Sequence, residues 1–191
     1  MSTQEKRFGP TALLTPANLM TGFRLVIAPV FIWLLLEHRV SWWTVAVGLA
    51  VAASDYFDGI VARRHGTTTS GAFLDPLADK VVVIGGLWAC VLSRPQPVTF
   101  FIAPAILITL REIWMSVYRS HAARRGLSVP ASRLAKWKTF AQDWAIGFTV
   151  LPFTADRPVF ADVTIWVAVL LTLYTGWQYY ADAKKVLARA R

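Results

Sequence analysis

Apolar residues in this 191-residue chain gather into six long runs, separated by short polar or proline-containing segments. A helix needs about 20 mostly apolar residues to cross the hydrocarbon core of a bilayer. The pattern therefore predicts an all-α integral membrane protein with six transmembrane helices, folded as a single domain over residues 1–191. The predicted spans are Leu19–Leu36, Trp42–Val61, Pro76–Leu92, Val98–Tyr118, Leu134–Leu151 and Val163–Tyr180.

The segment before the first run is more polar. Residues Arg7–Pro16 predict a short helix at the membrane interface. The first ten residues lack the apolar core of a signal peptide, so we expect insertion through an internal helix.

Composition supports lipid as the solvent. Apolar residues make up 55% of the chain and charged residues 16%, against about 25% charged in soluble proteins. The net charge of +9 comes from basic residues placed between apolar runs, which favours an anionic membrane surface over nucleic acid. The single cysteine, Cys90, lies in an apolar run and predicts buried packing without an intramolecular disulfide.

The distribution of Lys and Arg predicts the orientation. Of the 20 basic residues, 17 fall on one side of the predicted spans, and only Arg39, Arg94 and Arg157 fall on the other. Because basic residues concentrate in cytoplasmic segments, both termini are expected in the cytoplasm, as an even number of spans requires.

Four aspartates lie at the cytoplasmic ends of the second and third spans. Asp55 and Asp58 are i,i+3 partners, and Asp75 and Asp79 are i,i+4 partners, so each pair lies on one helix face. The predicted turn between the two helices, Arg64–Ser70, is short. The four carboxylates can therefore meet at one point.

Such a cluster needs neutralising, because close carboxylates repel one another in a low-dielectric site. Hard divalent cations, Mg²⁺ or Mn²⁺, suit carboxylate and phosphate oxygens, and such sites often hold two ions. Beside them, Gly59 and Ala62 lack bulk that would keep a nucleotide away, and Arg63 can pair with a phosphate. A helix N-cap would explain Asp75 alone. It leaves the spacing of the other three unexplained.

The full pattern from Asp55 to Asp79, Asp-x2-Asp-Gly-x2-Ala-Arg-x7-Gly-x3-Asp-x3-Asp, resembles the signature of CDP-alcohol phosphatidyltransferases. The seven-residue spacer is one shorter than the commoner family length. The resemblance implies a six-helix homodimer with a polar cavity open to the cytoplasm and the inner leaflet. It implies that Asp55, Asp58, Asp75 and Asp79 hold two metal ions, with Asp79 also the general base, and that Gly59, Ala62, Arg63 and Gly71 line the CDP site.

A motif upstream adds to this resemblance. Asn18-x2-Thr21-x2-Arg24 is similar to the first-helix motif in the branch of the family that makes phosphatidylglycerophosphate. These three residues would then face the same cavity and contribute to CDP binding. An N-cap role for Asn18 and an Arg24 side chain that snorkels to the headgroups explain the residues equally well.

Two segments downstream are also similar to that branch. They are Arg111–Glu112–Ile113 and Lys136–Gln142, the second with Ala135 where the family has glycine. Arg111, Lys136 and Lys138 would form a basic group near the carboxylates, suited to an acceptor with its own phosphate. The alternative is a cluster of inner-side charges that contacts lipid headgroups.

The expected reaction transfers a phosphatidyl group from CDP-diacylglycerol to sn-glycerol 3-phosphate, giving phosphatidylglycerophosphate and CMP. Within the family, the acceptor could instead be inositol phosphate, or phosphatidylglycerol as in a cardiolipin synthase. A cation transporter is the alternative from another class, but its carboxylates are expected near the bilayer midplane rather than at helix ends.

Overall fold

The computed structural model describes residues 16–65, 69–94, 99–124, 133–154 and 156–189; at several helix ends within these ranges it describes the backbone alone. Over the described residues the chain forms six α-helices and no strand, which confirms the all-α class. The helices are α1 (Pro16–Glu37), α2 (Trp42–His65), α3 (Thr69–Ser93), α4 (Thr99–Arg124), α5 (Arg133–Val150) and α6 (Val159–Arg189).

Each predicted span overlaps one helix, but several helix ends differ from the prediction. Helix α3 begins at Thr69, before the predicted turn ends, and α6 continues past Tyr180 to Arg189. Helical hydrogen bonds join backbone groups, so a helix can continue through polar residues after its apolar run has ended. The predicted interfacial segment Arg7–Pro16 lies outside the described residues up to its last residue, Pro16, where α1 begins.

Three helices are long and apolar enough to cross a membrane within the described part of the chain. They are the segments Asn18–Glu37 of α1, Phe101–His121 of α4 and Val159–Asp182 of α6. In α2 the apolar part within the described residues is shorter, Trp42–Ser54. Helices α3 and α5 also contain charged residues of the predicted site.

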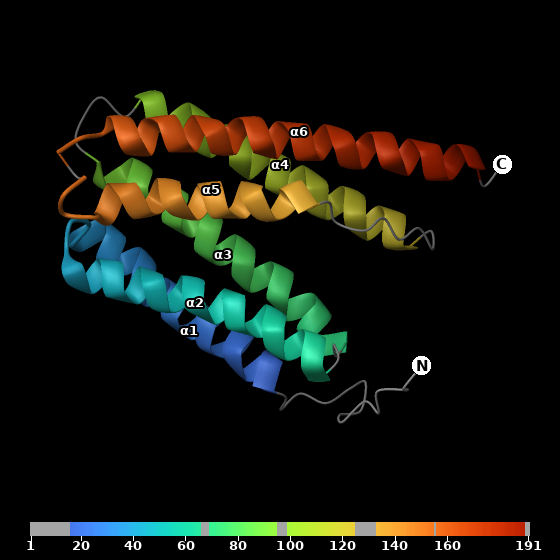
Figure 1. Ribbon diagram of the computed structural model, residues 1–191, viewed down its shortest axis with the longest axis horizontal. Coiled ribbons are helices and arrows are strands. Elements are labelled where there is room, and N and C mark those ends of the chain that lie inside the picture. The colour runs from blue at the N-terminus through green and yellow to red at the C-terminus, as the bar shows by residue number, and fades with distance from the viewer. Residues whose placement is uncertain (1–15, 66–68, 95–98, 125–132, 155, 190–191) are drawn as a thin grey trace. The chain divides into compact units, whose positions relative to one another are not determined.

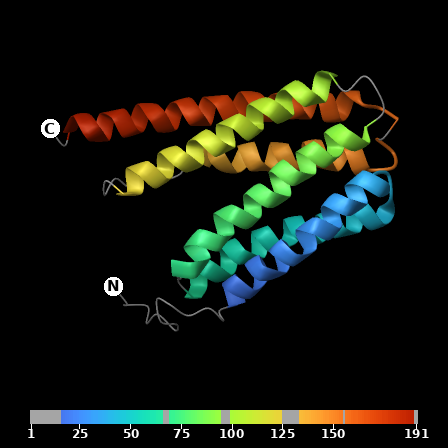
Figure 2. The same ribbon diagram turned by 180° about the vertical axis from the view of Figure 1, so that it is seen from behind.

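The chain divides into two compact units, the first containing α1, α2 and α3 and the second α4, α5 and α6 (Figures 1 and 2). In the first unit, α1 packs against both α2 and α3. A short turn joins α1 to α2, where the Thr44 hydroxyl donates to the His38 carbonyl at 2.6 Å. The two helices are therefore antiparallel, and the start of α1 lies at the same end of the unit as the end of α2.

Glycines set the close approach of α1 to its neighbours. A Cβ added at Gly48 of α2 would lie 2.9 Å from Cε2 of Phe31, and one added at Gly85 of α3 would lie 2.5 Å from Cδ1 of Ile32. Small residues at helix contacts let backbones pack tightly, which is a common device between membrane helices. Phe31, Leu35 and Leu87 are buried in this unit.

In the second unit, α4 packs along α6. Phe101 and Ile108 of α4 and Ile165 of α6 are fully or almost fully buried. Near the start of both helices, the Arg94 guanidinium pairs with the Asp162 carboxylate at 2.7 Å and lies 4.7 Å from the centroid of the Phe101 ring. This partly buried pair fixes the segment before α4 to the first turn of α6.

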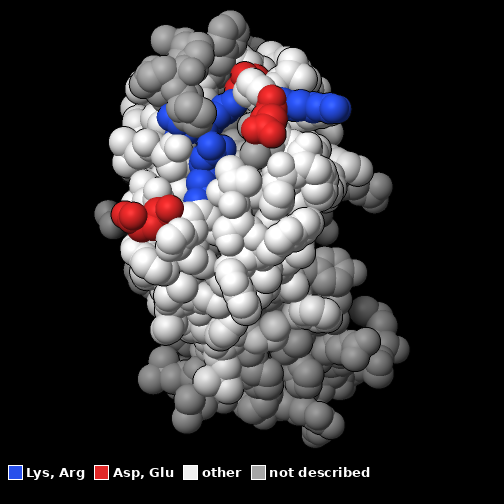
Figure 3. Space-filling model, turned by 90° about the vertical axis from the view of Figure 1, so that its left-hand side faces the viewer, with Lys and Arg blue, Asp and Glu red and all other residues white. Residues whose placement is uncertain are grey.

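Large apolar side chains cover much of the described surface. Val26, Trp43 and Trp177 are among the most exposed, at 75%, 77% and 69%. On the face drawn in Figure 3, described charged side chains are sparse, and basic and acidic ones lie near one another. Such a surface is costly in water and suits lipid. Cys90 is buried, as its position in an apolar run predicts.

Candidate functional site

The four predicted metal-binding aspartates lie on two helices of the first unit. Asp55 and Asp58 belong to the second half of α2, and Asp75 and Asp79 to the first half of α3. The end of α2 and the start of α3 are separated by residues 66–68 alone, so both acidic stretches lie at one end of the unit. The Asp79 side chain is half-buried. The side chains of the other three lie outside the described part, so their convergence stays a prediction.

The chemistry of this donor set fits the predicted ions. Successive helical residues turn by about 100°, so partners three or four positions apart point to the same side of their helix. Two such pairs at one end of a helical unit offer four carboxylates, the ligands that Mg²⁺ and Mn²⁺ prefer. These four residues would hold the ions.

The polar residues of α1 form a buried row. Asn18, Thr21 and Arg24 follow one another at three-residue intervals, and all three are buried, with Arg24 only 2% exposed. The Arg24 Nε donates to the Ser54 hydroxyl at 3.4 Å, and that hydroxyl donates to the Val51 carbonyl at 2.7 Å. An arginine that snorkels to the headgroups would be exposed, so the structure argues against that alternative.

The contact with Ser54 shows that this row of polar residues faces α2. Ser54 is the residue directly before Asp55, so the contact places Arg24 level with the start of the acidic stretch of α2. The remaining predicted CDP-site residues lie at the same end of the unit. Gly59, Ala62 and Arg63 are in α2 and Gly71 is in α3, and their surroundings are outside the described part.

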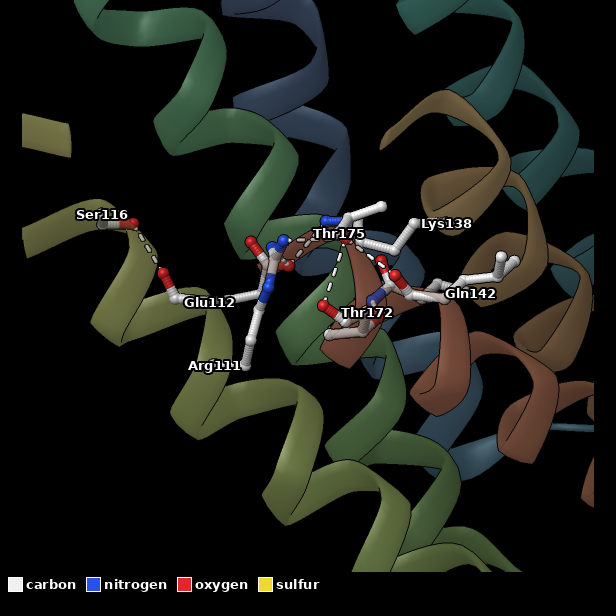
Figure 4. Close-up of polar contacts among 8 residues, drawn as sticks. Arg111, Glu112, Ser116, Lys138, Gln142, Thr172 and Thr175 are labelled. Carbon is white, nitrogen blue, oxygen red and sulfur yellow. Dashed lines mark hydrogen bonds and ion pairs between the residues drawn. The ribbon is translucent and has the colours of Figure 1, made fainter. Parts of the chain in front are cut away.

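The predicted acceptor residues belong to the second unit, where Arg111 of α4 and Lys138 of α5 come together through Glu112 (Figure 4). One carboxylate oxygen of Glu112, Oε1, accepts from Lys138 Nζ at 2.6 Å and from Arg111 Nη1 at 2.8 Å. The three side chains are only 10–13% exposed. Lys136 is also in α5, but its side chain is not described.

Helix α6 completes this polar cluster. Arg111 Nη2 donates to the Thr175 hydroxyl at 2.9 Å, and Gln142 Nε2 of α5 donates to the Thr172 hydroxyl at 3.2 Å. Gln142, Thr172 and Thr175 are all buried. The cluster therefore joins α4, α5 and α6, and within it two cations face one carboxylate.

Reasoning from the sequence assigned no role to Glu112, Thr175 or Ser54. A signal existed for Glu112, because an acidic residue inside an apolar run is costly unless it is paired. Its partner Lys138 is 26 residues away in the sequence, so the pairing itself needed the fold. Ser54 and Thr175 gave no signal, since a serine or threonine in a membrane helix commonly bonds to its own backbone.

Comparison with known proteins decides the family. The sequence model of the CDP-alcohol phosphatidyltransferase family matches residues 14–174. This chain belongs to that family. The match spans the acidic residues of α2 and α3 as well as Arg111 and Lys138.

Curated relatives of this phosphatidyltransferase are similar over nearly their whole length. A "probable phosphatidylglycerophosphate synthase" of Mycobacterium tuberculosis is 37% identical, covering 96% of this chain and 88% of the relative. Two relatives are named CDP-diacylglycerol–glycerol-3-phosphate 3-phosphatidyltransferase. That of Rickettsia typhi is 34% identical, covering 87% of this chain and 96% of its own. That of Bacillus subtilis is 33% identical, covering 86% of this chain and 92% of the relative.

Proposed function

We propose that this phosphatidyltransferase transfers a phosphatidyl group from CDP-diacylglycerol to sn-glycerol 3-phosphate, giving phosphatidylglycerophosphate and CMP. The observation that supports the acceptor most strongly is that relatives 33–37% identical over most of the chain are named for this activity. The buried cations Arg111 and Lys138 agree with it, because a phosphorylated acceptor needs positive charge.

In the proposed reaction, the acceptor hydroxyl oxygen bonds to the phosphorus that bears diacylglycerol. The bond from that phosphorus to the CMP oxygen breaks, and CMP leaves with the electron pair. Asp79 accepts the proton of the attacking hydroxyl. Two Mg²⁺ or Mn²⁺ ions, when bound at Asp55, Asp58, Asp75 and Asp79, would neutralise charge on the pyrophosphate and on CMP.

The binding roles divide between the two units. The CDP moiety would be held in the first unit by Asn18, Thr21, Arg24, Gly59, Ala62, Arg63 and Gly71. The acceptor phosphate would be held in the second unit by Arg111, Lys136 and Lys138. Since phosphoryl transfer depends mainly on positioning and charge neutralisation, these residues need no covalent nucleophile.

The membrane arrangement is part of the proposal. All six helices would cross the cell membrane, with both termini and the site on the cytoplasmic side and the acyl chains of the substrate remaining in the bilayer. The exposed apolar side chains and the bias of Lys and Arg toward one side support this arrangement. Homodimer formation stays a prediction from the family.

An assay of the purified protein tests the reaction. With CDP-diacylglycerol, Mg²⁺ and radiolabelled glycerol 3-phosphate, label should enter the lipid phase and CMP should be released in equal amount. EDTA should abolish both signals, and added Mg²⁺ or Mn²⁺ should restore them. Full activity in EDTA would contradict the metal site, and no release of CMP would contradict the transfer itself.

A further inference from the structure

Glu112 is a largely buried charged residue of the second unit to which the proposed reaction assigns no role. It lies in the apolar segment Phe101–His121, where a carboxylate is energetically costly and usually has a functional role. Its Oε1 atom accepts from Lys138 at 2.6 Å and from Arg111 at 2.8 Å. One oxygen therefore fixes both the ammonium and the guanidinium group.

The guanidinium of Arg111 has a second fixed point on α6. Its Nη2 donates to the Thr175 hydroxyl at 2.9 Å, and that hydroxyl donates to the Leu171 carbonyl at 2.7 Å. Bonds on Nη1 and Nη2 restrain the plane of the guanidinium as well as its position. In the described contacts, these bonds use two of the five N–H donors of a guanidinium, so donors remain for an anion.

Gly176 makes room for this arrangement. A Cβ added there would lie 3.3 Å from Arg111 Nε and 3.9 Å from Nη2. Arg111 Nε is buried and has no hydrogen-bond partner among the described residues. A methyl group at this position would press on the guanidinium and shift it by a few tenths of an ångström.

We propose that Glu112 is a positioning residue, which holds Lys138 and Arg111 together as one preformed site for the phosphate of the acceptor, with Gly176 leaving the space that Arg111 needs. Long cationic side chains lose conformational freedom when they bind an anion, and prior fixation removes that cost. Two cations beside one carboxylate also leave a surplus positive charge, which an anionic acceptor would neutralise. The inference rests on the proposed function, because it concerns the acceptor of that reaction.

Two other roles for Glu112 make different predictions. If Glu112 competed with the acceptor for the cations, removing its charge would lower the KM for glycerol 3-phosphate. If it only neutralised buried charge for stability, Glu112→Asp would behave as the wild type, and Glu112→Gln would lower the melting temperature with unchanged kinetics. A positioning role requires both the charge and the reach of the side chain.

Steady-state kinetics of four variants test the inference, with each substrate varied in turn. Glu112→Gln replaces a charged hydrogen-bond acceptor by a neutral one, and we expect about a tenfold higher KM for glycerol 3-phosphate. Glu112→Asp, which shortens the side chain, should raise the KM for glycerol 3-phosphate several-fold. Gly176→Ala should raise the same KM by a similar factor. The KM for CDP-diacylglycerol should change less than about twofold. Gly147→Ala is the matched control, because a Cβ at Gly147 meets no atom within 4 Å.

Calorimetric titration with glycerol 3-phosphate separates this inference from the proposed function. If the wild type binds glycerol 3-phosphate but releases no CMP, the proposed reaction is wrong, and weaker binding by Glu112→Gln still supports the positioning role. If Glu112→Gln and Gly176→Ala bind glycerol 3-phosphate as tightly as the wild type, the inference is wrong. If Glu112→Gln fails to fold, the result for Gly176→Ala decides the inference alone. A lower KM for glycerol 3-phosphate in either variant would also show that the inference is wrong.

Discussion

Buried charged side chains in this protein are held by polar partners from other segments of the chain. Arg24 contacts Ser54, Lys138 contacts Glu112, and Arg94 contacts Asp162. A charge removed from water is costly to leave unpaired, so these contacts offset much of that cost. Arg24 and Lys138 are also predicted substrate ligands, so a partner that stabilises each one also fixes where it can meet a substrate.

Kinetics can separate the predicted base from the predicted acceptor ligands. Asp79→Asn should lower kcat by about 10²–10⁴-fold with little change in the KM for glycerol 3-phosphate, because a general base acts mainly in the transition state. Lys138→Ala and Arg111→Ala should raise the KM for glycerol 3-phosphate about 10–100-fold, the equivalent of losing about 1.5–3 kcal/mol from a charged hydrogen bond.

The matched control for these alanine variants is Arg157→Ala, because Arg157 is an exposed residue before the start of α6. It should leave both KM values unchanged. If Lys138→Ala and Arg111→Ala behave like this control, the two cations serve only to orient the chain in the membrane.

Sequence reasoning identified Arg111 and Lys138 but could not predict what joins them. Residues i and i+1 of a helix point in directions about 100° apart, so Glu112 did not suggest a partner for Arg111. The long arginine side chain bends back to its neighbour, while Lys138 reaches the same oxygen from α5. That convergence depends on packing between helices, which no spacing in the sequence reports.

At the scale of single helices, the apolar pattern predicted that six helices exist but not where each one ends. Helices α1 and α2 begin and end close to their apolar runs, whereas α3 and α6 extend into polar sequence. Hydropathy reports the solvent around a segment, and helix formation depends on backbone hydrogen bonds that continue past the lipid. Of the four aspartates of the predicted site, Asp75 lies in such an extension, whereas Asp55, Asp58 and Asp79 lie inside the predicted spans.

The close contact between α1 and α3 predicts a matched pair of stability effects. Gly85→Val introduces a branched side chain whose Cβ would lie 2.5 Å from Ile32 Cδ1, and overpacking of this kind costs about 1–3 kcal/mol. Gly147→Ala, with open space around its Cβ, should be neutral or stabilising by up to about 1 kcal/mol. Thermal unfolding in detergent measures both.

A double variant tests whether contact with Ile32 causes the loss of stability in Gly85→Val. Gly85→Val combined with Ile32→Ala should recover part of the lost stability, because the clashing atoms are then removed. Additive losses in the double variant would show that contact with Ile32 is not the source of the effect.

At the scale of the whole molecule, three helices, α1, α4 and α6, have described segments long and apolar enough to cross a membrane. Helices α2, α3 and α5 contain the aspartates and lysines on which the proposed reaction depends. The proposed topology with six spans is tested separately.

Tags and a single labelling site test that topology. Tags at Met1 and Arg191 should both report the cytoplasm. Gln96→Cys, placed in the segment between α3 and α4, should react with an impermeant thiol reagent from outside the cell. The native Cys90 is buried, and Cys90→Ala removes any background. Termini on opposite sides of the membrane would rule out an even number of spans.

The transfer of a phosphatidyl group to glycerol 3-phosphate is tested most directly by competition among acceptors. Purified protein is given CDP-diacylglycerol and Mg²⁺ with equal concentrations of glycerol 3-phosphate, inositol phosphate and phosphatidylglycerol, and the lipid products are separated. We predict phosphatidylglycerophosphate as the dominant product, with CMP released in equal amount. Cardiolipin or phosphatidylinositol phosphate as the main product would contradict the proposed acceptor.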